Sequence, residues 1–160
     1  MIWHESFAPV IDNNSKILIL GSFPSVKSRE QGFYYGHKQN RFWKTLESVF
    51  CESVPVDING KIKFLLKNKI ALWDVIEKSS ITGSSDADIN LTNSVPVNFE
   101  KLFLDYPNIN LIILNGKKAN SVFEKFNPDC KIKKVCLPST SPANVLFDQS
   151  IWQKTIKENL

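Results

Sequence analysis

Short apolar runs that end at polar residues, glycine or proline recur along the chain. Residues 16–21, 70–76, 108–116 and 131–137 each form such a run. Continuous apolar runs of this length are typical of strands that are buried on both faces of a parallel sheet. We therefore predict four buried strands at these positions.

Segments with apolar residues at helical spacing lie between and after these runs. They predict helices at 42–50, 57–68, 99–105, 117–126 and 148–159. The alternation of strands and helices predicts an α/β fold in which a mainly parallel, four-stranded sheet is covered by helices on both faces. The polar stretch 79–98 is predicted to be a loop.

Composition narrows the class of protein. A chain of 160 residues with 42% hydrophobic residues fits one domain, 1–160. No apolar run approaches the ~20 residues of a membrane span, and the N-terminus lacks the basic-then-apolar order of a secretion signal. The three cysteines show no metal-ligand spacing. We expect a cytoplasmic protein with reduced thiols, no metal and no membrane partner, and monomer is the default state.

The carboxyl ends of the predicted strands indicate where ligands bind. In parallel sheets, ligands sit beyond these ends, which here carry Gly-Ser-Phe-Pro-Ser, Asp74, Asn115-Gly116 and the segment after Leu137. None of these segments is a glycine-rich phosphate loop or a dinucleotide fingerprint. We therefore expect no nucleotide cofactor.

Positive charge is concentrated in residues 27–44. This segment holds five lysines and arginines against one glutamate, a net charge of +4 that equals that of the whole chain. A local basic excess beside aromatic residues is typical of a surface that contacts a phosphate backbone. An ordinary solvated face would show the same charge.

Four motifs together resemble one protein family. They are Gly-Ser-Phe-Pro-Ser at 21–25, Tyr-Tyr-Gly-His-Lys-Gln-Asn-Arg-Phe-Trp at 34–43, Leu-Trp-Asp-Val at 72–75 and Leu-Pro-Ser-Thr-Ser-Pro-Ala-Asn at 137–144. Their order resembles the uracil-DNA glycosylase superfamily, in particular its hypoxanthine-DNA (DNA-deoxyinosine) glycosylase branch. The Asn-Arg-Phe-Trp string also resembles the mismatch-specific branch.

This resemblance implies a three-layer α/β/α fold and a base-excision repair enzyme. Its expected partner is DNA containing deaminated bases, from which it would remove a flipped base, with hypoxanthine favoured over uracil. It also implies that no metal or organic cofactor takes part, because the iron–sulfur relatives need four cysteines and this chain has three.

The catalytic candidates lie in the second motif. Many relatives position water with the third residue of the first motif, but that residue is Phe23 here, and a phenyl ring cannot polarise water. The resemblance instead points to Asn40, whose amide would orient the attacking water. His37 could donate to a phosphate or to the base. Asn40 could alternatively cap the following helix, and a loop histidine is often structural.

The base-binding candidates surround the strand ends. Tyr35 matches the aromatic residue that stacks on the extruded base in the mismatch branch. Asp74 ends a strand where the superfamily places a base-reading residue, and Ser22, Phe23 and Asn115 are expected nearby. The alternatives are a packing role for Tyr35, a helix cap or an ion pair for Asp74, and a turn of Asn115 with Gly116. Phe33, Tyr34 and Tyr35 cannot all face one core, so at least one should be exposed.

The DNA-binding candidates are hydroxyl and basic groups at the motif loops. They are Ser25, Arg41, Ser139, Thr140, Ser141 and Pro142. The segment 138–144 matches the loop that enters the minor groove, where Ser139 would bind a phosphate and Pro142 would act as the wedge. A serine- and proline-rich turn before the last helix would have the same composition.

Two other functions stay open. With Phe23 and Leu137 at positions that hold polar catalytic residues in many relatives, the chain could be a DNA-binding module without catalysis. It could also act on free nucleosides or nucleotides, although a small substrate needs no basic track.

Overall fold

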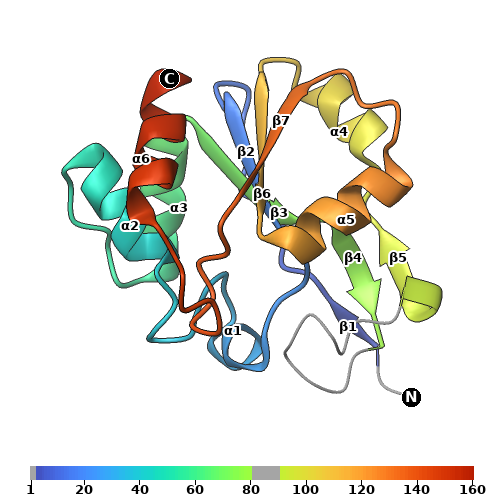
Figure 1. The fold of residues 1–160 in the computed structure, drawn as a ribbon, viewed down its shortest axis with the longest axis horizontal. Coiled ribbons are helices and arrows are strands. Elements are labelled where there is room, and N and C mark those ends of the chain that lie inside the picture. Colours follow the sequence, from blue (N-terminus) through green and yellow to red (C-terminus); the bar gives the residue numbers. More distant parts are fainter. Residues whose placement is uncertain (1–2, 81–90) are drawn as a thin grey trace.

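A parallel sheet of four strands lies at the centre of the computed structural model, which describes residues 3–80 and 91–160 (Figure 1). Its strands are β2 (Ile17–Gly21), β3 (Ile70–Asp74), β6 (Leu111–Asn115) and β7 (Lys133–Leu137), in the order β3-β2-β6-β7. Every neighbouring pair is parallel. The four predicted strands and their parallel arrangement are confirmed.

Helices cover both faces of this sheet, as the sequence predicts. Helices α2 (Phe42–Phe50), α3 (Ile58–Lys67) and α6 (Gln149–Glu158) cover one face, and α4 (Phe99–Asp105) and α5 (Lys117–Phe126) cover the other (Figure 1). The fold is therefore a three-layer α/β/α sandwich.

Strand β2 shows how alternate side chains supply the two cores. Ile17 and Ile19 pack on the face of α2, α3 and α6, whereas Leu18 and Leu20 pack on the face of α4 and α5. All four are at most 1% exposed. Because a strand alternates its side chains, only an uninterrupted apolar run can fill both cores at once.

One short helix was absent from the sequence prediction. Helix α1 (Val26–Gln31) has no apolar stripe, and its ends define it. The Ser25 side chain accepts from the Ser28 N–H at the start, and Gly32 ends the helix with a φ of 78°. Such local capping stabilises a helix that apolar periodicity cannot reveal.

The prediction of a loop over 79–98 was wrong in part. Strands β1 (His4–Glu5), β4 (Ile76–Ser79) and β5 (Ser94–Pro96) form a second, antiparallel sheet, and η2 (Leu91–Asn93) is a 3₁₀ turn. Residues 81–90 of the predicted loop lie outside the described residues. The second sheet escaped prediction because its strands are short, partly polar and paired over long sequence distances.

Candidate active site

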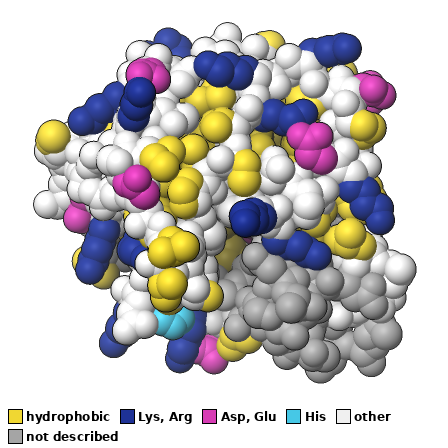
Figure 2. Space-filling view, viewed as in Figure 1, with side chains coloured by type: hydrophobic (Ala, Val, Ile, Leu, Met, Phe, Trp, Pro, Cys, Tyr) yellow, Lys and Arg dark blue, Asp and Glu magenta, His cyan; other side chains and the backbone are white. Residues whose placement is uncertain are grey.

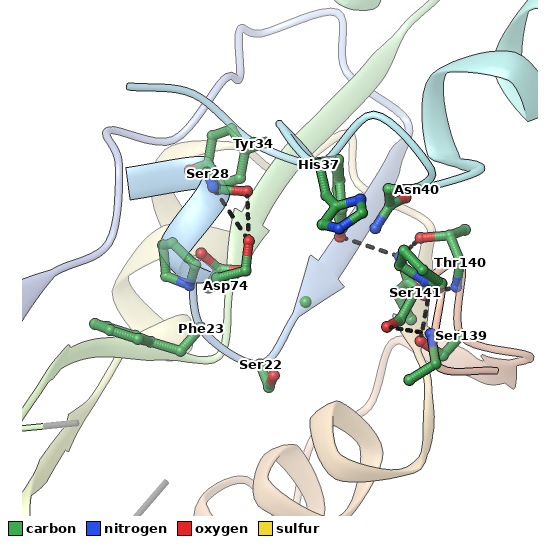
Figure 3. Close-up of a pocket in the computed structure, with 17 residues that line it drawn as sticks. Ser22, Phe23, Ser28, Tyr34, His37, Asn40, Asp74, Ser139, Thr140 and Ser141 are labelled. Carbon is green, nitrogen blue, oxygen red and sulfur yellow. Dashed lines mark hydrogen bonds between the residues drawn. The ribbon is translucent and has the colours of Figure 1, made fainter. Parts of the chain in front are cut away.

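A cavity of about 480 Å³ opens at the carboxyl ends of the parallel strands (Figure 3). Its walls come from residues 21–25 after β2, from the segment 34–40, from Asp74 and Asn115 at two strand ends, and from 139–143 after β7. Three of the four sequence motifs contribute most of these residues. The topology therefore brings together segments that lie far apart in the chain.

Glycine is required at the floor of this cavity. A Cβ atom on Gly21 would lie 2.7 Å from Asp74 Oδ1 and 3.0 Å from the Tyr35 hydroxyl oxygen. Both polar groups therefore approach the backbone at the end of β2 more closely than any other residue would allow. The first motif thus sets the floor against which Asp74 and Tyr35 lie.

Asp74 is a buried carboxyl group at the end of β3. It is 3% exposed, and its Oδ2 accepts a hydrogen bond of 2.8 Å from Ser6 Oγ. Burial raises the pKa of Asp74 from 3.8 to about 7, and the Ser6 hydrogen bond opposes this rise. Both protonation states are therefore accessible near neutral pH. Asp74 takes part in no ion pair and caps no helix among the described residues.

Tyr35 forms an aromatic wall of the cavity. Its ring stacks on Phe42 with centroids 4.2 Å apart, and its hydroxyl accepts a 3.1 Å hydrogen bond from Asn115 Nδ2. Its φ of 53° is uncommon for a bulky residue and persists only where the surroundings hold it. Phe33 and Tyr34 are buried and Tyr35 is half-buried, so the expected exposed member of the aromatic run is only partly exposed. Both Tyr34 and Tyr35 line the cavity.

Asn40 supports the start of a helix from one residue before its N-cap, Arg41, and also lines the cavity. Its Oδ1 accepts a 2.9 Å hydrogen bond from the Phe42 N–H at the start of α2. Because only the oxygen of an amide can accept from an N–H, this contact fixes the orientation of the side chain. The Nδ2 donors then point away from the helix, and Figure 3 shows the Asn40 amide beside His37 at the cavity.

His37 stands next to Asn40 with one ring nitrogen engaged. Its Nδ1 accepts a 3.0 Å hydrogen bond from the Gln39 N–H. A neutral imidazole whose Nδ1 accepts carries its proton on Nε2. His37 can therefore offer an N–H donor at the cavity rim, as the sequence suggested.

Asn115 links three parts of the site. Its Nδ2 donates to Tyr35 and, at 3.0 Å, to Thr140 Oγ1, while its Oδ1 accepts from the Thr140 N–H at 3.0 Å. These contacts join the end of β6 to the aromatic wall and to the loop after β7. Asn115 therefore has a supporting role beyond a turn with Gly116, while its predicted contact with the base stays a prediction.

The loop after β7 is fastened from several sides. Arg41 donates from one guanidinium nitrogen to the carbonyl oxygens of Ser141 (2.5 Å) and Asn144 (2.6 Å), and its guanidinium lies 4.6 Å from the Phe147 ring centroid. The Trp152 indole donates to the Pro138 carbonyl at 2.8 Å. The loop is therefore held in shape by its neighbours.

Two expected DNA contacts need revision in this arrangement. Thr140 is 0% exposed, so its side chain reaches no phosphate from this position, and its carbonyl accepts from the Arg41 N–H. Arg41 is half-buried, and its guanidinium donates to carbonyl oxygens of the loop. Both residues hold the loop, because a backbone that must present hydroxyl groups in fixed positions needs internal partners.

The remaining loop candidates line the cavity. Ser139 Oγ accepts from the Ser141 N–H, and Ser141 Oγ accepts from the Ala143 N–H, so both hydroxyl protons can be donated to a ligand. Pro142 follows Ser141 and lines the cavity as well. Figure 3 shows Ser139, Thr140 and Ser141 on the side of the cavity opposite Asp74.

The first motif supplies the other wall. Phe23 is 9% exposed, packs among the apolar residues on the face of α4 and α5, and borders the cavity. Ser22 is half-buried at the same wall, and its carbonyl accepts from the Ile76 N–H. Ser25 Oγ serves the start of α1 and also lies at the cavity. All three predicted residues are therefore at the site.

The basic segment is less uniformly exposed than its composition suggests. Lys38 and Lys44 are exposed, Lys27 pairs with Glu30 at 3.5 Å, and Arg29 donates to the Pro24 carbonyl. Figure 2 shows lysine and arginine side chains spread over one face rather than gathered in a single patch. An anionic partner that approached this face would thus meet scattered cations.

Sequence reasoning assigned no site role to four residues of interest. Tyr34 lies within the second motif, and its hydroxyl contacts the N-terminal segment. Ser6 lies outside every motif, so no local pattern marks its contact with Asp74. Val145 and Leu146 are 87% and 84% exposed, directly after the motif loop. Two adjacent apolar residues in a polar loop were a signal that the sequence did offer.

The family membership of the chain follows from the comparisons with known proteins. The family model of the uracil DNA glycosylase superfamily matches residues 8–158, and the chain belongs to that superfamily. Two relatives are named hypoxanthine DNA glycosylase. The one from Methanosarcina barkeri is 38% identical over 72% of this chain and 72% of its own length. The one from Methanosarcina acetivorans is 34% identical over 96% of this chain and 98% of its own length.

A solved structure supports the same placement. The solution NMR structure of a candidate uracil DNA glycosylase from Methanosarcina acetivorans superposes with a TM-score of 0.84 at 33% identity, covering 98% of each chain. The resemblance drawn from the motifs is confirmed at the level of the superfamily and of the relatives' branch. Within residues 3–80 and 91–160, no helix is long and apolar enough to span a bilayer.

Proposed function

We propose that this protein is a monofunctional DNA glycosylase that removes hypoxanthine from DNA. The observation that carries the proposal is one cavity that Tyr35, Asn40 and Asp74 line together. These groups supply an aromatic face, an amide donor and an ionisable carboxyl group, which are the three functions that base recognition and hydrolysis need. The names of the two curated relatives support hypoxanthine as the base.

Entry of the base requires that the nucleotide leave the helix. Extrusion costs a few kcal/mol, and less for a damaged pair. Stacking on an aromatic face returns ~1–3 kcal/mol per base. Phe42 already covers one face of the Tyr35 ring, so the extruded purine would lie against the other face.

Asp74 is suited to the pairing edge of hypoxanthine. That edge offers a ring N–H and a carbonyl oxygen. An ionised Asp74 would accept from the N–H, and a protonated Asp74 would donate to the carbonyl, so burial that brings the pKa to about 7 leaves both contacts available. The pH dependence of excision should therefore report the titration of this group.

Hydrolysis follows from water held at Asn40. The water oxygen, accepting from Asn40 Nδ2, adds to C1′ of the sugar, while the bond from C1′ to N9 breaks and its electron pair stays with the purine. The proton released by the water finally resides on the departing base. An amide is no base, so its contribution is positioning against an oxocarbenium-like sugar. The His37 Nε2–H can stabilise charge that develops on the base.

The loop after β7 would hold the DNA. The hydroxyl groups of Ser139 and Ser141 can donate to phosphate oxygens, and Ser25 lines the same cavity. Pro142 and the exposed pair Val145 and Leu146 are apolar groups that can fill the space left by the extruded nucleotide. Arg41 and Thr140 keep this loop in place from within.

A second candidate is a glycosylase for uracil or mismatched thymine. The solved structure with TM-score 0.84 is described as a candidate uracil DNA glycosylase, which favours this reading. A binding module without catalysis is the third possibility. The side chain of Phe23 supplies no polar group at the cavity, which favours this possibility. Leu137 is 3% exposed and packs in the core, so its side chain has no bearing on catalysis.

An excision panel tests these possibilities together. Duplexes carrying one deoxyinosine, deoxyuridine, deoxyxanthosine or mismatched thymidine are incubated with the protein and then cleaved with alkali. We expect strand breaks at deoxyinosine in the duplex. With the free nucleoside inosine as substrate, we expect no release of hypoxanthine. Breaks with none of the four duplexes would overturn the assignment as a glycosylase, and breaks at another base alone would replace hypoxanthine.

A further inference from the structure

The N-terminal segment is fixed beside the buried end of the cavity. Strand β1 pairs with β4, and the Ser6 N–H donates to the Glu77 carbonyl at 2.7 Å. Further along, the Val10 N–H donates to the Leu72 carbonyl at 2.9 Å, and the Leu72 N–H donates back at 2.8 Å. Backbone contacts on both sides of Ser6 therefore hold its side chain in one place.

Two side-chain contacts tie this segment to residues that line the cavity. Ser6 Oγ donates to Asp74 Oδ2 at 2.8 Å and is 3.4 Å from the Phe7 carbonyl oxygen, so the carboxyl group is the closer acceptor. The Tyr34 hydroxyl lies 3.1 Å from the Phe7 carbonyl and 3.0 Å from that of Ala8. The segment thus contacts the site without lining the cavity.

The Ser6 contact distinguishes the two oxygens of Asp74. Oδ2 is occupied by the hydroxyl of Ser6, whereas Oδ1 lies against Gly21 at the cavity floor, near the Tyr35 hydroxyl. A half-turn of the carboxyl group would only exchange two equivalent oxygens, whereas any smaller rotation would lose the 2.8 Å hydrogen bond. One acceptor is therefore presented to the cavity in a defined direction.

We propose that Ser6 is a positioning residue for base recognition: it fixes the Asp74 carboxyl group so that Oδ1 is the oxygen that meets the extruded base. The inference rests on the proposed function, in which Asp74 reads the pairing edge. It makes the second, antiparallel sheet part of the specificity apparatus, because β1 carries the chain into Ser6.

The electrostatic surroundings of Asp74 make this contact measurable. Tyr34 and Tyr35 are titratable groups that face it, with His37 farther along the same cavity. On the N-terminal segment, Glu5 pairs with Lys78 at 3.5 Å, and both side chains are exposed. Burial, and to a lesser degree the Asp74 charge, raises the pKa of Tyr34, so that hydroxyl stays a neutral donor. The Ser6 hydroxyl is the donor that favours the ionised form of Asp74.

The test compares Ser6→Ala with the wild-type chain. The pKa of Asp74 is measured by carbon-13 NMR of its side-chain carboxyl group, and single-turnover excision of hypoxanthine is measured across pH. Loss of a hydrogen bond to a charged group should raise the pKa of Asp74 by about one pH unit. The limb of the excision profile near neutral pH should move by the same amount in the same direction.

Three variants make the outcome decisive. Glu5→Gln, one residue away, removes the ion pair with Lys78 and should leave both curves unchanged. Ser6→Thr keeps the hydroxyl and should restore wild-type behaviour. Ser6→Cys has a similar volume and a weaker donor, so it should raise the pKa of Asp74 by less than about one pH unit. This variant replaces Ser6→Ala in the test if Ser6→Ala does not fold.

Each result bears on the inference. An unchanged pKa of Asp74 in folded Ser6→Ala would overturn it, and so would a shifted pKa with an unchanged excision profile. A wild-type protein that excises no base would refute the proposed function instead, because the NMR titration examines the contact between Ser6 and Asp74 without catalysis.

Discussion

The support that Asn40 gives to a helix can be separated by substitution from its proposed role in catalysis. Its Oδ1 supports the start of α2, and its Nδ2 is free of that task. Capping residues contribute ~1 kcal/mol to stability, whereas a water-positioning amide would affect the rate alone. The contact that supports the helix would therefore also hold the side chain in place for its proposed role in positioning water.

Asn40→Ala and Asn40→Ser should therefore differ in stability and agree in activity. We expect both to lose excision by about 100-fold or more, a typical loss for a misplaced reacting group, while each still binds duplex DNA. Serine can replace the cap through its hydroxyl, so Asn40→Ser should unfold at a higher temperature than Asn40→Ala. Wild-type excision by Asn40→Ser would show that capping is the whole role of Asn40.

Asp74 imposes a cost on stability that depends on pH. Its pKa is raised from 3.8 to about 7 by burial. Between these values the folded protein retains a proton that the unfolded chain has lost, so the free energy of unfolding falls as pH rises. The cost is absent below pH 4 and complete above pH 7 to 8, where it amounts to about 4 kcal/mol at most.

Asp74→Asn should remove this cost and keep an acceptor for Ser6. Chemical denaturation should show that the variant is more stable than the wild type at pH 8 and about equal to it at pH 3.5. Excision by the variant should be reduced and should lose the pH dependence centred near 7. Equal stability of the two proteins at pH 8 would contradict the assigned ionisation of Asp74.

At the scale of elements, the loop after β7 is shaped by Arg41 from the start of α2 and by Trp152 from α6. These contacts explain how a loop without regular structure can present Ser139, Ser141 and Pro142 at the cavity rim. They also separate two ways in which an arginine can aid DNA binding, by contacting phosphate or by supporting the loop.

The salt dependence of DNA binding tells these two roles apart. Loss of one phosphate contact lowers the slope of log K against log salt concentration by about 0.9. Arg41→Met should weaken binding and leave the slope unchanged, because its guanidinium contacts loop carbonyls. Lys38→Ala and Lys44→Ala, at exposed positions, are the comparison variants. A slope reduced by about 0.9 in Arg41→Met would reassign this residue to the phosphate backbone.

The exposed apolar pair after this loop should matter for duplex substrates alone. A wedge fills the gap in a base stack, and single-stranded DNA offers no such gap. Leu146→Ala should therefore slow excision from duplex DNA about tenfold or more, for a loss of more than about 1.4 kcal/mol, with little effect on single strands. Leu104→Ala on α4, at a side chain 77% exposed, is the matched control. Equal effects on both substrates would exclude a wedge at Leu146.

At the scale of the whole molecule, the arrangement of layers follows directly from the apolar pattern. Every residue of β2 and β6 is buried, so the apolar runs in the sequence match the positions that the fold buries. Helices α2, α4 and α5 have the predicted bounds, because amphipathic periodicity marks them. Helix α1 and the antiparallel sheet depend on caps and long-range pairing, which no local window contains.

The candidate site was predictable to the extent that it lies in contiguous motifs. The strand-end rule and the motifs brought Tyr35, Asn40 and Asp74 to one edge of the sheet, and the structure places them at one cavity. The burial of Thr140, the inward contacts of Arg41 and the contact between Ser6 and Asp74 depend on tertiary packing. Such features require coordinates, because they join residues that are 68 to 103 positions apart or lie beneath the surface.

The central claim is that a deaminated base leaves the helix and enters the cavity bounded by Tyr35, Asn40 and Asp74. The most direct test is a crystal structure with a duplex that carries one 2′-fluorinated deoxyinosine, whose glycosidic bond resists hydrolysis. The account predicts that the purine lies against the Tyr35 ring, with its pairing edge at Asp74 Oδ1 and a water between Asn40 and C1′. A purine that stays stacked in the duplex, or that binds outside this cavity, would contradict it.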